Sequence, residues 1–300
     1  MTNTISPESP AAWRDPALGT RHELTLPQGT LTVFDSGSGD PVVFVHGLLV
    51  NANLWRKVIP PLAREYHCVA IDLPFGSHTT AMPDADLTAP GLAQLVIAAI
   101  EKLDLGPVTL VGNDSGGAVS QLVVAARPDL VARLILTSCD AYENFPPPFF
   151  NFVGLAARAP GGLTSLALSM RIRAVRRLPI AYGWLTHGPL DRAVGDSYVL
   201  PVSTKAIRED VRRVIGGIDS KYTLAAAKTF ADFKKPVLLA WSAGDRFFPE
   251  RYAERLAADF PDARIEWIHD SRTFSPEDQP AQLAAAITTF LNATRAESPR

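Results

Sequence analysis

The 300-residue sequence contains only two cysteines, Cys68 and Cys139, and each lies in or beside a strand that we predict to be buried. A free thiol in such a position behaves as a small hydrophobic side chain, so we expect no disulfide framework. The chain also lacks a basic surplus, because 29 Lys and Arg residues face 31 Asp and Glu residues. This balance gives no indication of nucleic acid or an anionic membrane as a partner.

Long apolar runs are absent as well. No stretch is long and uncharged enough to cross a bilayer, and residues 1–18, rich in Pro, Ser, Thr and Asp, contain no apolar segment of signal-peptide length. We therefore expect a cytoplasmic protein whose residues 1–18 are disordered or loosely ordered. No spacing of ligand side chains requires a metal, and we expect neither a metal nor another cofactor.

What the chain does contain is a large apolar fraction, 47% of its residues, which is enough to bury the core of one α/β domain with an insertion. Its most informative stretch is 108–118, where an apolar run breaks at Gly112 and continues through Asp114 and Gly116 into a helical segment. The flanking glycines remove Cβ atoms that would clash with the strand and the helix. The Asp114 side chain is therefore predicted to protrude at the carboxyl edge of a sheet.

Strands alternate with helices along most of the chain. Strands are predicted at 23–26, 30–34, 41–45, 67–71, 108–111, 134–137, 236–241 and 265–268, and helices at 55–64, 92–103, 119–126 and 279–291. This alternation predicts a mostly parallel sheet flanked by helices, with ligands bound at the carboxyl ends of the strands. It lapses between Asp140 and about Phe230, where Leu- and Ala-rich stretches indicate helices.

Three glycine-containing motifs each follow a predicted strand: His46-Gly47, Gly112-x-Asp114-x-Gly116 and Gly244-Asp245. In this order they resemble the α/β-hydrolase superfamily, over about residues 20–292. The resemblance implies an α/β-hydrolase core at 19–142 and 231–293, with a helical cap at 143–230 inserted after the sixth strand. It also implies that the backbone N–H groups of Leu48 and Ser115 form an oxyanion hole.

The aspartate at the centre of the second motif resembles the haloalkane dehalogenases and epoxide hydrolases of this superfamily. There a carboxylate attacks carbon to give an alkyl-enzyme ester, which activated water then cleaves. The resemblance implies that Asp114 is the nucleophile and that Asp245 orients the base. The histidine that the superfamily uses as base is missing, because Thr273 occupies its place in the loop 270–280. Threonine cannot act as a general base near neutral pH.

Other histidines are candidates for the missing base. His78 follows strand 67–71 at the same sheet edge as Asp114, and we predict that it faces the site, the alternative being a solvated loop histidine. His269 is interpreted as a packed side chain at a strand end. His46 is interpreted mainly as a residue that packs its own loop, and it is also counted among the residues expected to line the substrate site.

The remaining residues favour an epoxide over a haloalkane as the small, apolar substrate. Leu48 and Ser115 stand where haloalkane dehalogenases place halide-binding side chains. The expected cap supplies Tyr182 and Tyr198, which resemble the tyrosine acids of epoxide hydrolases. Trp184 is expected to bind substrate beside Tyr182, and the alternative is that Tyr182-Gly183-Trp184 only packs the cap on the core.

Two other functions stay open. The threonine at position 273 favours a ligand-binding protein of hydrolase fold without turnover, and a lyase or isomerase could use Asp114 as a base. In each case the expected partner is a small molecule, and the protein is expected to be a monomer or a homodimer.

Five carboxylates follow predicted strands: Asp72, Asp114, Asp140, Glu143 and Asp245. Close packing of such groups would raise some of their pKa values, because like charges in a low-dielectric site disfavour double ionisation. The alternative interpretation is that Asp72 caps a turn and that Asp140 and Glu143 hydrogen-bond loop backbone.

Overall fold

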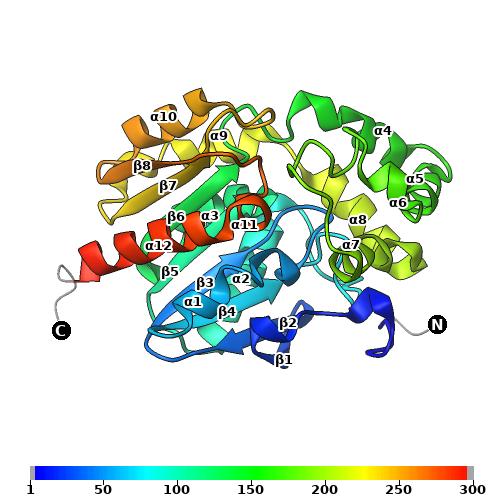
Figure 1. The fold of residues 1–300 in the computed structure, drawn as a ribbon, viewed down its shortest axis with the longest axis horizontal. Coiled ribbons are helices and arrows are strands. Elements are labelled where there is room, and N and C mark those ends of the chain that lie inside the picture. Colours follow the sequence, from blue (N-terminus) through cyan, green and yellow to red (C-terminus); the bar gives the residue numbers. More distant parts are fainter. Residues whose placement is uncertain (1–3, 296–300) are drawn as a thin grey trace.

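The computed structural model describes residues 4–295, and its centre is an eight-stranded sheet with the strand order β1-β2-β4-β3-β5-β6-β7-β8. The strands are β1 (Thr20–Leu26), β2 (Gly29–Ser36), β3 (Asp40–Val45), β4 (Tyr66–Asp72), β5 (Val108–Asp114), β6 (Val131–Cys139), β7 (Val237–Ser242) and β8 (Ala263–Ile268). Strand β2 pairs antiparallel with β1 and β4, and all other pairs are parallel. The predicted fold class is confirmed (Figure 1).

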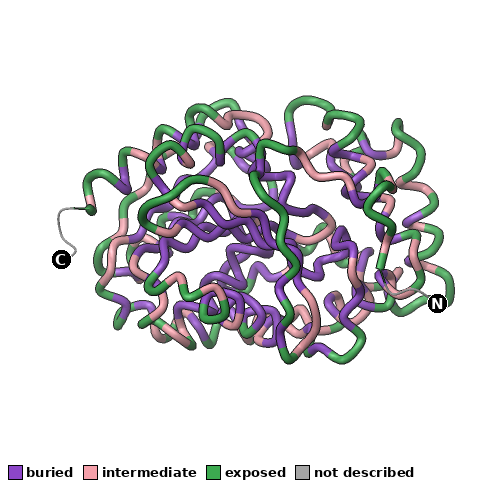
Figure 2. Tube along the Cα trace, turned by 90° about the horizontal axis from the view of Figure 1, so that it is seen from below, coloured by how far each residue is buried: buried purple, intermediate pink, exposed green. Residues whose placement is uncertain are grey.

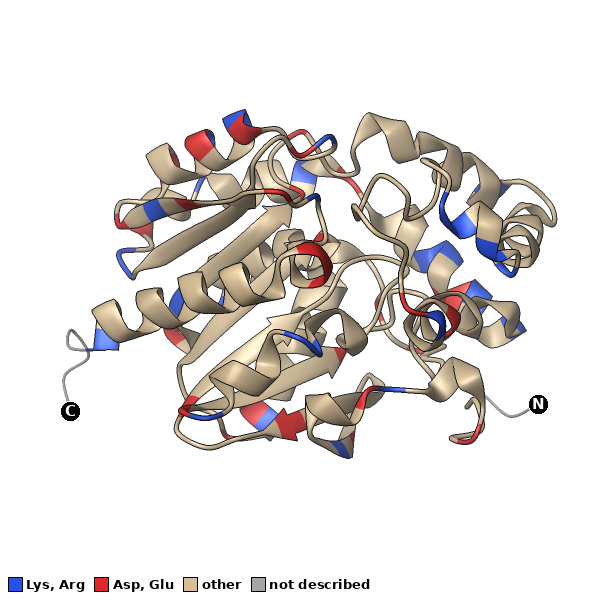
Figure 3. Cartoon of the chain, in the orientation of Figure 1, with Lys and Arg blue, Asp and Glu red and all other residues tan. Residues whose placement is uncertain are grey.

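The inner strands are buried on both faces, which explains their continuous apolar sequence. Residues 42–45 of β3 have no exposed surface, and neither have Leu110 and Val111 of β5. The purple tube in the middle of Figure 2 marks this core. Figure 3 shows Lys, Arg, Asp and Glu spread over outer helices and loops, with few on the strands. The carboxyl ends of β3, β5, β6 and β7 share one sheet edge, because these strands run parallel.

The helices outside the long insertion are α1 (Ile59–Leu62), α2 (Ala89–Lys102), α3 (Ser115–Ala126), α10 (Glu250–Asp259), α11 (Ser275–Asp278) and α12 (Pro280–Thr294). Helix α2 packs on α3, while α12 packs on α1 and crosses in front of the strands in Figure 1. The helix expected at 55–64 is shorter, because its first turn contains Pro60 and Pro61, which have no backbone N–H to donate. Within residues 4–295, no helix has the length and apolar character needed to traverse a bilayer.

Between β6 and β7 the chain forms six α-helices: α4 (Asn151–Arg158), α5 (Gly162–Met170), α6 (Arg173–Arg176), α7 (Arg192–Val199), α8 (Lys205–Gly217) and α9 (Ser220–Ala227). Figure 1 shows α4 to α8 grouped beyond the strand arrowheads. Helix α9 instead packs on α3, and Thr223 Oγ1 donates to the Tyr142 carbonyl. The segment beyond the sheet edge is therefore α4 to α8, which we call the cap helices.

Residues 4–18 differ from the expected loose order. They include two short 3-10 helices, at Pro10–Ala12 and Pro16–Leu18. Between these helices Arg14 Nε donates to Asp72 Oδ2 at 2.8 Å, and both side chains are buried. Asp72 also accepts the backbone N–H of Ala52, the first residue of a short 3-10 helix, at 2.7 Å. A buried carboxylate is stabilised by such a cation, so this ion pair ties the N-terminal segment to the sheet edge. Residues 1–3 lie outside the described residues.

Candidate active site

Asp114 stands at the sharp turn between β5 and α3, with φ of 53° and ψ of −131°. A Cβ added to Gly112 would come within 2.7 Å of the Gly116 carbonyl oxygen, and a Cβ on Gly116 would come within 2.4 Å of the His46 carbonyl oxygen. Only glycine therefore permits both contacts. The predicted elbow is present, and it is pressed against the loop that follows β3.

The loop after β3 approaches the Asp114 carboxyl at Gly47. A Cβ on Gly47 would lie 2.2 Å from Asp114 Oδ2, so a side chain there would displace the carboxyl. The backbone N–H groups of Ser115 and Leu48 hydrogen-bond the Asp114 carboxyl, which lowers its pKa against the effect of burial. The two positions that the sequence marked as an oxyanion hole thus meet at one carboxyl group.

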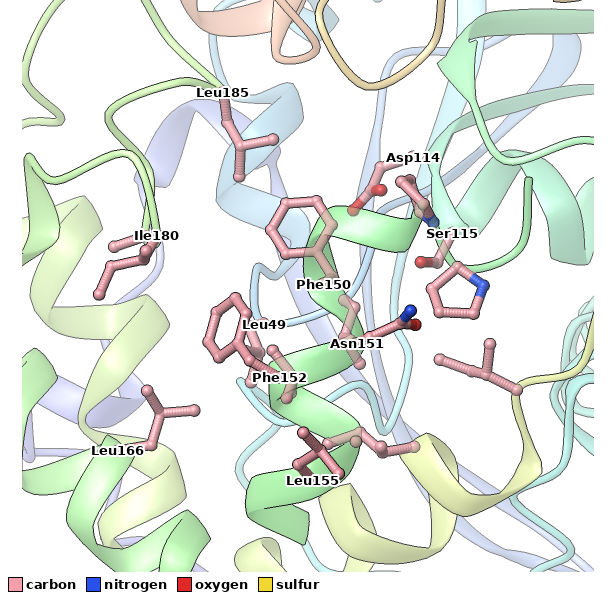
Figure 4. Close-up of a pocket in the computed structure, with 18 of the residues that line it drawn as sticks. Leu49, Asp114, Ser115, Phe150, Asn151, Phe152, Leu155, Leu166, Ile180 and Leu185 are labelled. Atoms are coloured by element: carbon pink, nitrogen blue, oxygen red, sulfur yellow. The ribbon is translucent and has the colours of Figure 1, made fainter.

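A cavity of about 430 Å³ opens from Asp114 toward the cap helices. Its lining is mostly apolar and comes mainly from the cap, including Phe150, Phe152, Leu166, Ile180 and Leu185. Figure 4 shows Asp114 and Ser115 at one end and Leu155 and Leu166 farther away. A mostly apolar cavity with a few polar groups at one end is typical of a small-molecule site.

The Asp114 carboxyl has an unusual pKa. Burial, and after it the charge of Asp245, raises the pKa of Asp114 to about 7. The side chain keeps some accessible surface, and Asp114 lines the cavity, so this surface faces the cavity. Near neutral pH the carboxyl can therefore hold or release a proton.

Asp140, the first residue after β6, also lines the cavity. It is only 1% exposed, and its Oδ2 accepts a hydrogen bond from Ser115 Oγ at 3.0 Å. Burial, followed by the charge of Asp114, holds the pKa of Asp140 well above its usual range. The interpretation that Asp140 and Glu143 hydrogen-bond loop backbone is wrong for Asp140, and the Glu143 carboxylate pairs with Arg255 at 3.0 Å. In the sequence, the only indication that Asp140 belongs to the site was its position at the end of a predicted strand.

Asp245 and Thr273 lie together, as their motifs predicted. Asp245 Oδ1 accepts the backbone N–H groups of Phe247 and Phe248 at 2.8 and 3.0 Å, and the Thr273 hydroxyl at 3.2 Å. Burial raises the pKa of Asp245 despite these hydrogen bonds. Thr273 is fully buried, and its carbonyl accepts from Asn113 Nδ2 at 2.8 Å. Neither Asp245 nor Thr273 is among the described residues that line the cavity.

The prediction that His78 faces Asp114 is wrong. Its ring Nε2 lies 3.0 Å from Asp210 Oδ2, and its Nδ1 accepts the backbone N–H of Gly76. Asp210 belongs to α8, which brings a carboxylate over the loop after β4. A buried imidazole is stabilised by such a partner, so the ring turns toward the cap and does not line the cavity.

The other candidate histidines are also outside the cavity. His46 is fully buried, with Nδ1 2.8 Å from the Gly47 carbonyl oxygen and Nε2 accepting from the Leu73 N–H. Burial lowers the pKa of His46 to about 4. It packs its own loop, as interpreted, and its assignment to the substrate site is wrong. His269 is exposed rather than packed.

The cap aromatics divide into one residue at the cavity and two away from it. Tyr182 lines the cavity, but its hydroxyl donates to the Leu49 carbonyl at 2.7 Å. Tyr198 is fully buried, with its ring centroid 5.9 Å from that of Tyr182, and Trp184 packs against Phe247. Neither Tyr198 nor Trp184 lines this cavity, so the predicted substrate contact is wrong for Trp184, while Tyr198 lines a smaller adjoining pocket together with Tyr182.

Two polar residues of α4, Asn151 and Arg158, line the cavity without having been singled out from the sequence. Figure 4 shows the Asn151 amide on the same side of α4 as Ser115. No sequence signal identifies them, because helical periodicity does not say which face of a cap helix meets the cavity.

Comparison with known proteins places the chain in a family. Residues 40–278 match the family model described as alpha/beta hydrolase fold. The uncharacterized hydrolase YugF of Bacillus subtilis is 25% identical over 83% of this chain and 89% of its own. Haloalkane dehalogenase 2 of Mycobacterium bovis is 28% identical over 87% and 91%. The solved structure of the epoxide hydrolase CorEH superposes with a TM-score of 0.77 at 21% identity, covering 92% of this chain and 99% of that one. The chain belongs to the α/β-hydrolase fold family and is a hydrolase.

Proposed function

We propose that the protein hydrolyses a small, apolar epoxide with Asp114 as the nucleophile. The observation that carries this proposal is the Asp114 carboxyl itself, which stands on the elbow at one end of an apolar cavity. The N–H groups of Leu48 and Ser115 hydrogen-bond it and favour the carboxylate form, which is the form that attacks carbon. The same N–H groups would stabilise the oxyanion that forms when water adds to the ester.

An epoxide fits this cavity better than a haloalkane. A departing halide needs hydrogen-bond donors, but the Ser115 hydroxyl is already donated to Asp140 and the Tyr182 hydroxyl to a backbone carbonyl. No tryptophan is found among the described residues of the cavity wall. Epoxide opening releases ring strain and instead needs one proton for the oxygen. The relation to a haloalkane dehalogenase and the shared fold with an epoxide hydrolase both support a carbon electrophile as substrate.

Intact-protein mass spectrometry tests the proposal. The protein is incubated with 1,2-epoxyhexane or, as an electrophile that needs no proton, allyl bromide, then quenched and digested to locate any ester. We expect one adduct on Asp114, formation of the diol from the epoxide, and neither with Asp114→Asn. The matched control is Asp84→Asn, which removes an exposed carboxyl and leaves the reaction unchanged.

The same experiment separates the proposal from its rival. Thr273 at the usual position of the base favours a ligand-binding protein without turnover. Such a protein would bind the epoxide, detected by calorimetry, and would form neither ester nor diol. An adduct of equal yield on Asp114→Asn, with conversion back to aspartate excluded by mass, would also contradict the nucleophile assignment.

A further inference from the structure

We propose that Asp140 is the acid and the base of this site: it protonates the epoxide oxygen and later takes a proton from the water that cleaves the Asp114 ester. The inference rests on the proposed function and names the group that replaces the missing histidine.

The first argument is position. Asp114 and Cys139 are register partners in the parallel pair β5 and β6, so Asp140 emerges beside Asp114 at the same sheet edge. Both residues line the cavity. Ser115 lies between them in the hydrogen-bond network, because its N–H bonds the Asp114 carboxyl and its hydroxyl donates to Asp140 Oδ2 at 3.0 Å. This bond fixes the orientation of the Asp140 carboxyl.

The second argument is the unsatisfied Oδ1 of Asp140. This atom is buried and has no hydrogen-bond partner among the described residues. An unpaired buried carboxylate oxygen is costly, whereas a protonated carboxyl can keep its proton there without that cost. Burial and the charge of Asp114 hold the pKa of Asp140 well above its usual range, which supports the protonated form. The two N–H groups on Asp114 favour ionisation of that carboxyl instead.

The third argument is elimination within the site. Tyr182 has donated its hydroxyl to Leu49, and Asp245 does not line the cavity. Of the six histidines of the chain, none is among the described cavity-lining residues. Arg158 lines the cavity, but a guanidinium has donors and no acceptor and cannot serve as a base. Asp140 is thus the titratable group beside Asp114 that can both give and accept a proton.

In the first step, an Asp114 carboxylate oxygen forms a bond to an epoxide carbon while the carbon–oxygen bond of the ring breaks. The proton of Asp140 passes to the ring oxygen, which becomes a hydroxyl. The products are a hydroxyalkyl ester of Asp114 and an Asp140 carboxylate. Because Asp114 is now an uncharged ester, its charge no longer opposes ionisation of Asp140.

In the second step, Asp140 takes a proton from water as the water oxygen bonds to the carbonyl carbon of the ester. The N–H groups of Leu48 and Ser115 stabilise the resulting oxyanion. Its collapse breaks the bond to the alkyl oxygen, which takes the proton of the new Asp114 carboxyl and leaves as the diol. Asp114 is again a carboxylate and Asp140 is again protonated, so one epoxide and one water give one diol.

The test is the lifetime of the Asp114 ester in Asp140→Asn, followed by quenched mass spectrometry with allyl bromide and with 1,2-epoxyhexane. Asparagine can neither give nor take the proton, and general acid–base catalysis contributes on the order of 10²- to 10⁴-fold. We expect the allyl ester to form at nearly the wild-type rate and to be hydrolysed slower by that factor. Ester formation from the epoxide is slowed as well, and Asp140→Glu retains part of both activities.

The outcomes separate the two proposals. Wild-type hydrolysis of the ester by Asp140→Asn would overturn the role of Asp140 and leave Asp114 as the nucleophile. Absence of any Asp114 ester in the wild type and the variant, with both probes, would overturn the proposed function and this inference with it. Should Asp140→Asn not fold, Ser115→Ala replaces it. That change frees the Asp140 carboxyl but keeps the backbone N–H, so ester hydrolysis must slow, and an unchanged rate contradicts the inference.

Discussion

Replacing Asp114 by asparagine is expected to stabilise the fold at neutral and alkaline pH. Burial, followed by the charge of Asp245, raises the pKa of this carboxyl from 3.8 to about 7. A carboxyl whose pKa is higher in the folded state binds its proton more tightly there, so stability falls as pH rises from about 4 to about 7. Well below pH 3.8 the carboxyl is protonated in both the folded and the unfolded state, so it does not destabilise the fold there.

The size of the penalty follows from the pKa. Each pKa unit corresponds to about 1.4 kcal/mol, so a rise from 3.8 to about 7 costs the fold on the order of 4 kcal/mol above pH 7. Water in the cavity solvates the accessible part of the carboxylate, so the expected penalty is about 2 to 4 kcal/mol. The asparagine amide keeps an acceptor oxygen for the Leu48 and Ser115 N–H groups and carries no charge, so it avoids the penalty.

The free energy of unfolding is measured by urea denaturation at pH 5 and pH 8 for the wild type, Asp114→Asn and the surface control Asp84→Asn. The unfolded carboxyl is already mostly ionised at pH 5, so part of the penalty is present there, and more than half of it develops between these pH values. The wild type and Asp84→Asn should lose about 1 to 2.5 kcal/mol more than Asp114→Asn. Equal losses in all three proteins would refute the reasoning.

Three further substitutions test the site and the cap. Thr273→His places an imidazole beside Asp245 and should shorten the lifetime of the Asp114 ester. Overpacking of this buried position should cost about 1 to 3 kcal/mol of stability. An unchanged ester lifetime, with the ring hydrogen-bonded to Asp245, would contradict the prediction that a histidine at position 273 can act as the base. His78→Ala removes one hydrogen-bond partner of the buried Asp210 carboxylate and should lower the free energy of unfolding by about 1 to 3 kcal/mol. The pH profile of turnover should stay the same, and a shifted profile would show that His78 takes part in the reaction. Tyr182→Phe should retain epoxide opening within a few-fold, since the hydroxyl is donated to backbone; loss of activity would identify the tyrosine as the acid.

The local motifs were predictable because each depends on a backbone conformation that only certain residue types at neighbouring positions allow. Gly112 and Gly116 are needed wherever a strand turns sharply into a helix, so they locate Asp114 without any knowledge of the rest of the chain. The alternation of strands and helices likewise predicted the fold class, and it depends on periodicity and turn chemistry, which act over a few residues. The contact between Asp245 and Thr273 was implied by the resemblance to the α/β-hydrolases.

The partners of individual side chains were decided by the tertiary structure. His78 meets Asp210, 132 residues away, because α8 packs over its loop, and no pattern around His78 indicates that carboxylate. Trp184 has the composition of a substrate-site residue, yet it packs against Phe247 and does not line the cavity. Asp140 was visible in the sequence as a strand-end carboxylate. Only the tertiary structure, through the pairing of β5 with β6 and the hydrogen bond from Ser115, shows that it shares a cavity with Asp114. Burial and the approach of like charges are properties of the folded chain, and they determine which of these carboxyl groups keeps its proton.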